Sequence, residues 1–127
     1  MSENIFIKGL YLVATPIGNL GDISARAVDV LKSADLIACE DTRNTQKLLT
    51  LLGIGGKKLT AYHNFNAEKA CPKILEHLKN GETVALVSDA GTPLVSDPGY
   101  KLVRECVDNG VYVTSVPGAC AFLTALQ

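Results

Sequence analysis

The chain has 127 residues, 47% of them hydrophobic, with 12 basic and 13 acidic side chains and a formal net charge of −1. This composition excludes a disordered chain and is typical of one globular, soluble domain. The near-neutral charge excludes a broad basic surface for nucleic acid. We expect a cytoplasmic protein without a membrane partner, because no apolar run has the length of a membrane span and residues 1–4 lack the basic start of a secretory signal.

The first, second and third predicted strands cover residues 10–14, 35–39 and 58–62. Between them, the apolar spacing predicts a helix from about 23 to 34, with Asp22 or Ser24 available as N-cap, and a second helix that ends at Gly53. A third helix ends at Asn80-Gly81, and we expect it to begin near Pro72, because proline is favoured in the first turn of a helix.

The second half of the chain continues the alternation of strands and helices. The run 83–87 is apolar without a polar-apolar alternation, which indicates a parallel strand buried on both faces. A helix is predicted from about 100 to 108 and a fifth strand over 112–116. The order predicts an α/β fold, a mostly parallel five-stranded sheet flanked by helices with right-handed crossovers. A further helix should follow Pro117-Gly118, and because no cap or breaker precedes Gln127, we expect a fragment of a longer protein.

The cysteines and histidines do not form a metal-binding pattern. Cys39, Cys71, Cys106 and Cys120 are scattered without a C-x-x-C pair, and the two histidines do not complete a ligand spacing. We therefore expect buried thiols in a reducing compartment and no metal site.

Every predicted strand is followed by a polar or turn-forming segment, namely 15–22, 40–43, 62–64, 88–99 and 117–119. In an open parallel sheet these segments lie along one edge, where ligands bind. The segment 88–99 is the richest, since its aspartates, serines and glycines offer acceptors, hydroxyls and close backbone approach to a small polar ligand. The usual nucleotide fingerprints are absent: Gly18-Asn19-Leu20-Gly21 lacks a third glycine, and no phosphate loop exists, which argues against a phosphotransfer enzyme.

Four segments resemble the signatures of a family of small-subunit ribosomal RNA methyltransferases within the tetrapyrrole methylase superfamily. They are LVATPIGNL at 12–20, CEDTR at 39–43, SDAGTPLVSDPG at 88–99 and VPGA at 116–119. The resemblance implies an S-adenosylmethionine-dependent enzyme that methylates the ribose 2′-hydroxyl of a cytidine in 16S rRNA of the small ribosomal subunit. It also implies a homodimer of two-domain subunits, in which residues 1–127 form a tetrapyrrole methylase-like amino-terminal domain and the carboxyl-terminal domain is missing.

The resemblance also implies where the cofactor binds. Its contacts fall in the acidic loop after the fourth strand and in the segment after V-P-G, at Asp89, Val95, Ser96, Cys120 and Ala121. Asp89 is supported independently, because it directly follows a buried strand. Ser96 and Asp97 are explained equally well as turn or cap residues beside Pro98.

The sulfonium donor is already activated, so the enzyme has to position the hydroxyl and remove its proton. Asp41, Asp22 and His63 are the candidates for that proton transfer. Asp22 is explained slightly better as the N-cap of the first helix, and His63 is explained as a turn residue.

Two arginines are candidates for binding RNA phosphate, Arg26 and Arg43. Arg26 is equally explained as a solvated charge on the first helix. Within 40–43, Glu40 and Arg43 are alternatively an ion pair, and Thr42 is alternatively the cap of the second helix. We favour function for Asp41 and Arg43, because three ionisable residues in four directly follow an apolar strand.

Two other functions remain open. A methyltransferase of the same superfamily that acts on a tetrapyrrole or a protein side chain would share the fold, and it should lack the combined 39–43 and 88–99 segments. A non-enzymatic binding module would keep the sheet and fail to bind adenosylmethionine even at full length.

Overall fold

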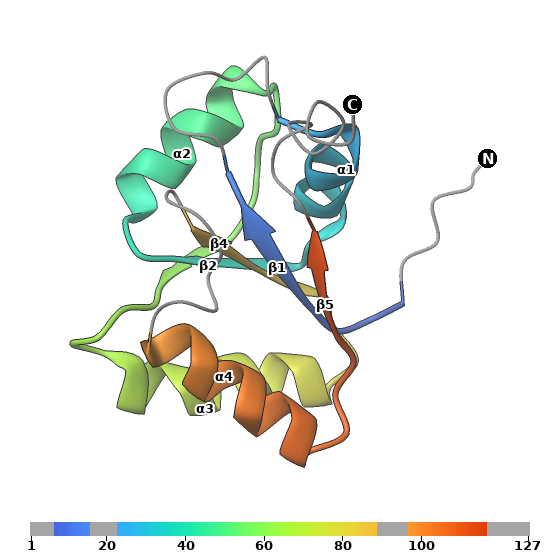
Figure 1. Ribbon diagram of the computed structural model, residues 1–127. Helices are drawn as coiled ribbons and strands as arrows, with labels where there is room; N and C mark the ends of the chain where they lie inside the picture. Colours follow the sequence, from blue (N-terminus) through green and yellow to red (C-terminus); the bar gives the residue numbers. More distant parts are fainter. Residues whose placement is uncertain (1–6, 16–22, 89–96, 117–127) are drawn as a thin grey trace, which may run out of the picture.

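A computed structural model describes residues 7–15, 23–88 and 97–116. Within these ranges strands and helices alternate (Figure 1), in the order β1 (Leu10–Ala14), α1 (Ala25–Ser33), β2 (Leu36–Cys39), α2 (Thr42–Leu51), β3 (Leu59–Ala61), α3 (Ala67–Lys79), β4 (Val84–Ser88), α4 (Asp97–Asp108) and β5 (Val113–Val116). The predicted α/β class and the five predicted strands are confirmed. The helix predicted after Pro117-Gly118 lies outside the described residues.

The strands form one parallel sheet in the order β3-β2-β4-β1-β5. β4 occupies the centre, where Val84 is in register with Leu10 of β1 on one side and with Leu36 of β2 on the other. The first four residues of β4 are buried. Helices cover both faces of this strand, which explains why its sequence shows no alternation.

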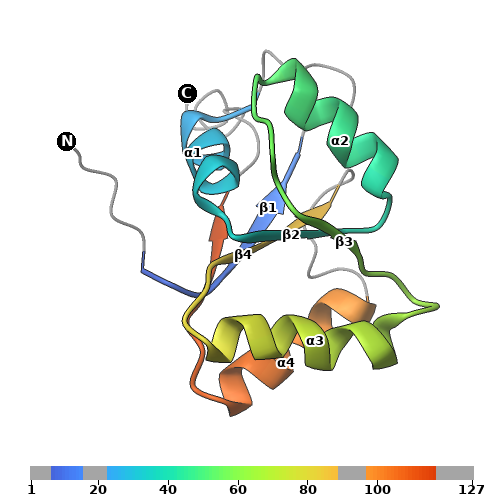
Figure 2. The ribbon, with the colours of Figure 1, turned by 180° about the vertical axis from the view of Figure 1, so that it is seen from behind.

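Two helices pack on each face of the sheet, α1 and α2 on one and α3 and α4 on the other (Figures 1 and 2). The core against α1 and α2 contains alternate residues of the strands, including Tyr11, Val13, Ile37 and Val87. The core against α3 and α4 contains the residues between them, including Leu10, Leu12, Ala38 and Leu86. The period of two along each strand therefore divides the apolar residues between two separate cores.

The chain leaves neighbouring strands toward opposite faces. β2 continues into α2 and β1 into α1, whereas β3 and β4 continue into α3 and α4 on the other face. Across β3-β2-β4-β1 the direction of exit therefore changes at every step. Such changes of direction are the points at which ligands bind at the carboxyl ends of parallel strands.

The prediction that α3 begins near Pro72 is wrong, because the helix starts at Ala67 and Pro72 lies inside it. Burial explains the difference, since Ala67, Ala70 and Cys71 face the core from the turns before and around the proline. Pro72 itself is exposed. The lost backbone hydrogen bond at Pro72 is thus outweighed by the apolar contacts of the preceding turn.

The described cysteines, Cys39, Cys71 and Cys106, are buried and form no disulfide. Within the described ranges, no three His, Cys, Asp or Glu side chains are placed to hold a metal ion. The helices seen in those same ranges are too short or too polar to cross a membrane.

Candidate functional site at the carboxyl edge of the sheet

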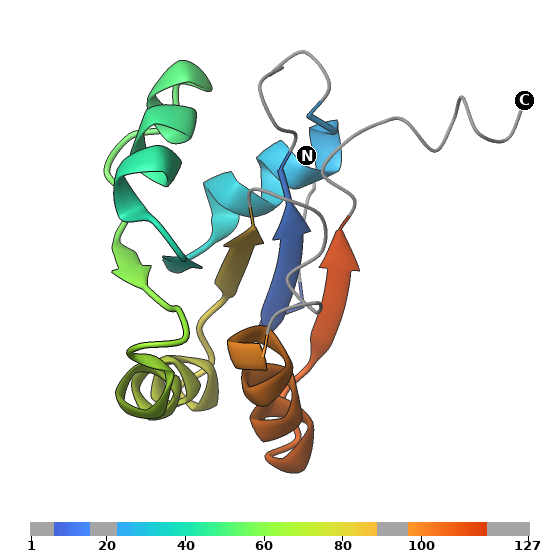
Figure 3. The same cartoon turned by 60° about the vertical axis from the view of Figure 1, so that its left-hand side comes forward.

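All five strands are paired in parallel, so their carboxyl ends lie along one edge of the sheet, and in Figure 3 the arrows of β4, β1 and β5 point the same way. At its centre the ends of β1 and β4 are tied together by Thr15. Both its backbone nitrogen and its Oγ1 donate to the carbonyl oxygen of Ser88, each at 2.9 Å. Thr15 is buried and Ser88 is half-buried, so these hydrogen bonds hold the ends of the two strands together at the centre of the edge.

Asp41 begins α2, directly beyond the end of β2. Its Oδ1 accepts the backbone amide of Arg43 at 2.9 Å and that of Asn44 at 3.4 Å. Asp41 is therefore the N-cap of α2, and the alternative in which Thr42 caps this helix is wrong. The cap uses Oδ1, so Oδ2 can accept a hydrogen bond from another group.

Arg43 is exposed on the first turn of α2. In the described part of the chain no salt bridge joins Arg43 to Glu40, although both side chains are described. The ion-pair alternative for these two residues is therefore wrong. An exposed guanidinium beside a helix N-terminus is well placed to meet a phosphate.

The end of β3 is a compact turn. The Tyr62 hydroxyl donates to the Pro98 carbonyl at 2.6 Å, which holds this turn against the start of α4. The backbone nitrogen of His63 donates to Asn66 Oδ1 at 2.8 Å, and Asn66 Nδ2 donates to the Ala61 carbonyl at 2.8 Å. The backbone nitrogen of Phe65 donates to His63 Nδ1 at 3.2 Å.

That last hydrogen bond fixes the tautomer of His63. Because Nδ1 accepts the Phe65 amide, a neutral His63 ring carries its proton on Nε2. His63 thus offers a donor, rather than a base, to a group in front of Nε2. Asp41 is the stronger of the two described candidates for accepting a proton.

The two described acid-base candidates lie on neighbouring strand ends. β2 pairs with β3, and the backbone nitrogen of Tyr62 donates to the Cys39 carbonyl at 2.8 Å. Asp41 is two residues beyond Cys39, and His63 directly follows Tyr62. The structure therefore brings the segments 40–43 and 62–64 together, as predicted.

The N-cap of α1 is Ser24, whose Oγ accepts the backbone amide of Ala27 at 3.1 Å. The explanation of Asp22 as the N-cap of this helix is therefore wrong; Asp22 itself lies outside the described residues. Arg26 is exposed on the first turn of α1. Burial and the neighbouring Tyr112 raise the pKa of Tyr11, and the positive charge of Arg26 opposes that rise, so the guanidinium lies within electrostatic reach of the Tyr11 hydroxyl.

The five predicted cofactor contacts, Asp89, Val95, Ser96, Cys120 and Ala121, lie outside the described residues. Asp97, explained from the sequence as a turn or cap residue, is instead the first residue of α4, which begins earlier than predicted and has Pro98 in its first turn. The predicted boundary near Tyr100 was late because Pro98 and Gly99 are buried parts of the helix.

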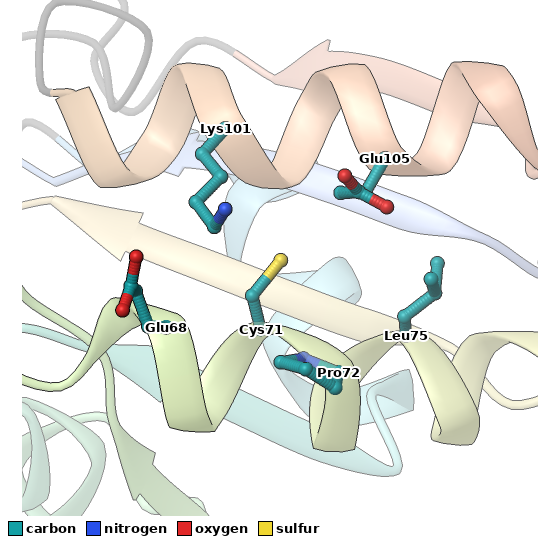
Figure 4. A pocket seen from close by; sticks show the side chains of 6 residues that line it. All are labelled: Glu68, Cys71, Pro72, Leu75, Lys101 and Glu105. Atoms are coloured by element: carbon teal, nitrogen blue, oxygen red, sulfur yellow. The ribbon is translucent and has the colours of Figure 1, made fainter.

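A cavity of about 330 Å³ lies between α3 and α4 (Figure 4), where Lys101 and Glu105 face Glu68 and Cys71 across the two helices. Its lining comes from these two helices alone and includes no residue that follows a strand. This cavity is therefore not the candidate site.

Sequence reasoning missed two residues of this edge. Thr15 was seen only as part of a segment, and the signal for its role is a hydroxyl immediately after a buried strand. Phe65 was not considered, yet it is a single aromatic residue between polar neighbours, and its side chain is 97% exposed.

Comparison with known proteins gives the family and the fold of the chain. The family model described as Tetrapyrrole (Corrin/Porphyrin) Methylases matches residues 9–127. Proteins named Ribosomal RNA small subunit methyltransferase I are similar to 92% of the chain in Mesorhizobium japonicum, at 57% identity, and in Bacillus subtilis, at 55%. The relative from Escherichia coli O157:H7 is 53% identical over 93% of the chain. The chain spans about two-fifths of the length of these relatives, 40 to 41%.

Two solved structures share the fold. Both are uroporphyrin-III-C-methyltransferases of Thermus thermophilus, with TM-scores of 0.66 and 0.65 at 19% and 22% sequence identity. They cover 90% and 91% of this chain, which corresponds to 49% and 51% of their own chains. At such low identity they support the architecture only.

Proposed function

The chain belongs to the tetrapyrrole methylase family, and we propose that it forms the amino-terminal domain of an S-adenosylmethionine-dependent methyltransferase. The proposed reaction is methylation of the ribose 2′-hydroxyl of a cytidine in 16S rRNA of the small ribosomal subunit, by a homodimer of two-domain subunits in the cytoplasm. The observation that carries this proposal is the identity of 50 to 57% with relatives named for ribosomal RNA methylation.

The described edge fits a bound cofactor of this kind. Thr15 and Ser88 join the ends of β1 and β4, and the chain leaves these strands toward opposite faces, which is the arrangement that admits a ligand beyond the sheet. We assign cofactor contacts to Asp89, Val95, Ser96, Cys120 and Ala121. When bound, adenosylmethionine supplies an electrophilic methyl group, so no metal is needed for activation.

The residues of this chain then have to bind RNA, align the hydroxyl and remove its proton. Asp41 is proposed as the proton acceptor, because its Oδ1 is held by α2 while Oδ2 is left for the substrate hydroxyl. His63 is proposed to orient the ribose or phosphate through Nε2–H. Arg43 and Arg26 are proposed to bind phosphates, and Asp22 is the alternative base if Asp41 proves dispensable.

The test uses the full-length protein with assembled small ribosomal subunits and adenosylmethionine labelled in its methyl group. We expect label on one cytidine, in a form that resists alkaline cleavage of the adjacent phosphodiester because the 2′-hydroxyl is blocked. The Asp89→Ala variant should show no labelling at low cofactor concentration. Raising the cofactor concentration should restore part of the labelling. Label on a tetrapyrrole or a protein, with none on RNA, would contradict the proposed substrate.

A further inference from the structure

Phe65 is the most exposed large hydrophobic residue in the described part of the chain. Its side chain is 97% exposed, whereas the other exposed large hydrophobic residues there lie between 42% and 71%. An aromatic ring left wholly in water is unfavourable, because burying it against another surface would release the water around it. Phe65 lies four residues beyond Ala61, the last residue of β3, at the carboxyl edge that carries the candidate site.

The turn beneath Phe65 is rigidly built. The Phe65 backbone nitrogen donates to His63 Nδ1, the backbone nitrogens of His63 and Asn66 are bonded within the same turn, and Asn66 Nδ2 donates to the end of β3. Tyr62 ties the turn to α4. These hydrogen bonds fix the backbone that carries the ring. Little backbone conformational entropy is therefore lost when a partner covers the ring.

The surroundings of Phe65 suit a base better than an apolar protein surface. The His63 ring meets it edge-on, with centroids 6.0 Å apart and planes at 64°, and Asn64 and Asn66 flank it in sequence. The next charged residues, Glu68 and Lys69, have opposite signs. A lone flat ring among hydrogen-bonding groups is typical of base stacking, whereas protein partners bind to continuous apolar patches.

The charge of the whole chain points the same way. With 12 basic and 13 acidic residues, these 127 residues attract phosphate only weakly, so contacts that do not depend on charge gain weight in RNA binding by this part of the protein. Stacking of a base on an aromatic ring is such a contact. It also selects single-stranded nucleotides, because bases inside a duplex do not expose their faces.

We propose that Phe65 stacks on an unpaired base of the substrate RNA, next to the nucleotide that is methylated, with the His63 Nε2–H donating to the same nucleotide. Phe65 is therefore a positioning residue for RNA. This inference rests on the proposed function.

The test measures methyl transfer to assembled small ribosomal subunits by the full-length protein and by its variants. Phe65→Ala should raise the KM for subunits about tenfold, leave the KM for adenosylmethionine unchanged, and leave the slope of log affinity against log salt unchanged, because no phosphate contact is lost. Phe65→Tyr should retain nearly full affinity, whereas Phe65→Leu should behave like Phe65→Ala. Leu51→Ala is the matched control, since Leu51 is 71% exposed at the far end of α2, and it should change nothing.

Two results would overturn the inference. The first is an unchanged KM for subunits in Phe65→Ala while the wild-type protein methylates RNA, which leaves the proposed function intact. The second is a lowered melting temperature or a dissociated dimer in Phe65→Ala that Phe65→Leu restores, because this would place Phe65 in a protein contact. Failure of the wild-type protein to methylate RNA would overturn the proposed function, and with it this inference.

Discussion

Asp41 combines two tasks that are usually given to different residues. Its Oδ1 completes the first turn of α2, and its Oδ2 is the proposed proton acceptor. Holding a carboxylate by backbone amides fixes its direction without the entropy loss of a flexible side chain. The same arrangement makes the residue difficult to study with alanine, because Asp41→Ala would remove the cap and cost about 1 kcal/mol of stability in addition to any loss of activity.

Asp41→Asn and Arg43→Ala should therefore separate proton transfer from RNA binding. Asparagine still caps the helix but cannot take a proton, so Asp41→Asn should lower the single-turnover rate about 100-fold or more at saturating RNA with an unchanged melting temperature.

Arg43→Ala should weaken RNA binding and reduce the slope of log affinity against log salt by about 0.7 to 0.9, because one phosphate contact is lost. A normal saturated rate in Asp41→Asn would transfer the role of base to Asp22, and an unchanged salt slope would exclude a phosphate at Arg43.

At the level of strands and helices, the start of β1 is a tight point in the sheet. The Gly9 carbonyl accepts the Val84 amide at 2.9 Å, and the neighbouring Leu10 amide donates to the Tyr112 carbonyl at 2.8 Å. A Cβ on Gly9 would lie 2.4 Å from that carbonyl oxygen. The nearest atom is thus a backbone oxygen held by the Leu10 amide, which cannot turn aside as the end of a side chain can.

Gly9→Ala should accordingly lower the free energy of unfolding by about 1 to 3 kcal/mol, measured by urea denaturation. Gly55→Ala is the matched control, because Gly55 has no atom within 4 Å of the new Cβ and its φ is not positive. The control should stay within about 0.5 kcal/mol of the wild-type chain. Equal losses in the two variants would show that the close approach to Tyr112 relaxes easily.

The packing of α3 and α4 on the sheet makes the free energy of unfolding change with pH in the alkaline range. Burial, reinforced by Cys71 and Glu105, raises the pKa of the Cys106 thiol to about 12 from an ordinary value of 9.0. Between these values the unfolded chain holds fewer protons than the folded chain. The free energy of unfolding should therefore be at its full value below pH 9 and decline as the pH rises toward 12.

Cys106→Ala should make this decline shallower while lowering stability at pH 7 by about 1 kcal/mol through the lost packing. The measurement is urea unfolding at several pH values between 7 and 11. Ile74→Val removes core volume from the same side of the sheet without removing a titrating group, so its curve should shift downward in parallel with that of the wild type. An unchanged slope in Cys106→Ala would mean that the thiol ionises alike in both states.

The order and nature of the elements followed from the sequence because each has a strong local pattern, such as the apolar run of β4 or the glycine that ends α2. The strand order did not, since the placement of β4 between β1 and β2 depends on contacts between distant residues. The start of α3 was missed because the proline rule considers only local geometry, whereas burial of Ala67 and Cys71 decided the outcome. The exposure of Phe65 and the tautomer of His63 likewise depend on folded coordinates.

For the whole molecule, the cofactor site is expected to need more than this chain. The described residues supply one edge of a sheet, and the chain spans only about 40% of its relatives. We expect the 127-residue chain to bind adenosylmethionine at least about tenfold more weakly than the full-length protein in calorimetric titrations. Asp89→Ala should weaken the binding further in both proteins. Equal affinities would show that the cofactor site lies wholly within these residues.

The pairing of β1 has a consequence for synthesis of the protein. Within the described residues β1 pairs with β4 at one edge and with β5 at the other, so a nascent chain cannot cover both edges of β1 until the ribosome has released residues beyond Val116. At ordinary elongation rates that delay is on the order of 10 s. During it the apolar side chains of β1 have no complete sheet to join and stay exposed to water. Slow codons before the end of β5 would therefore lengthen this exposure, whereas slow codons after β5 would not.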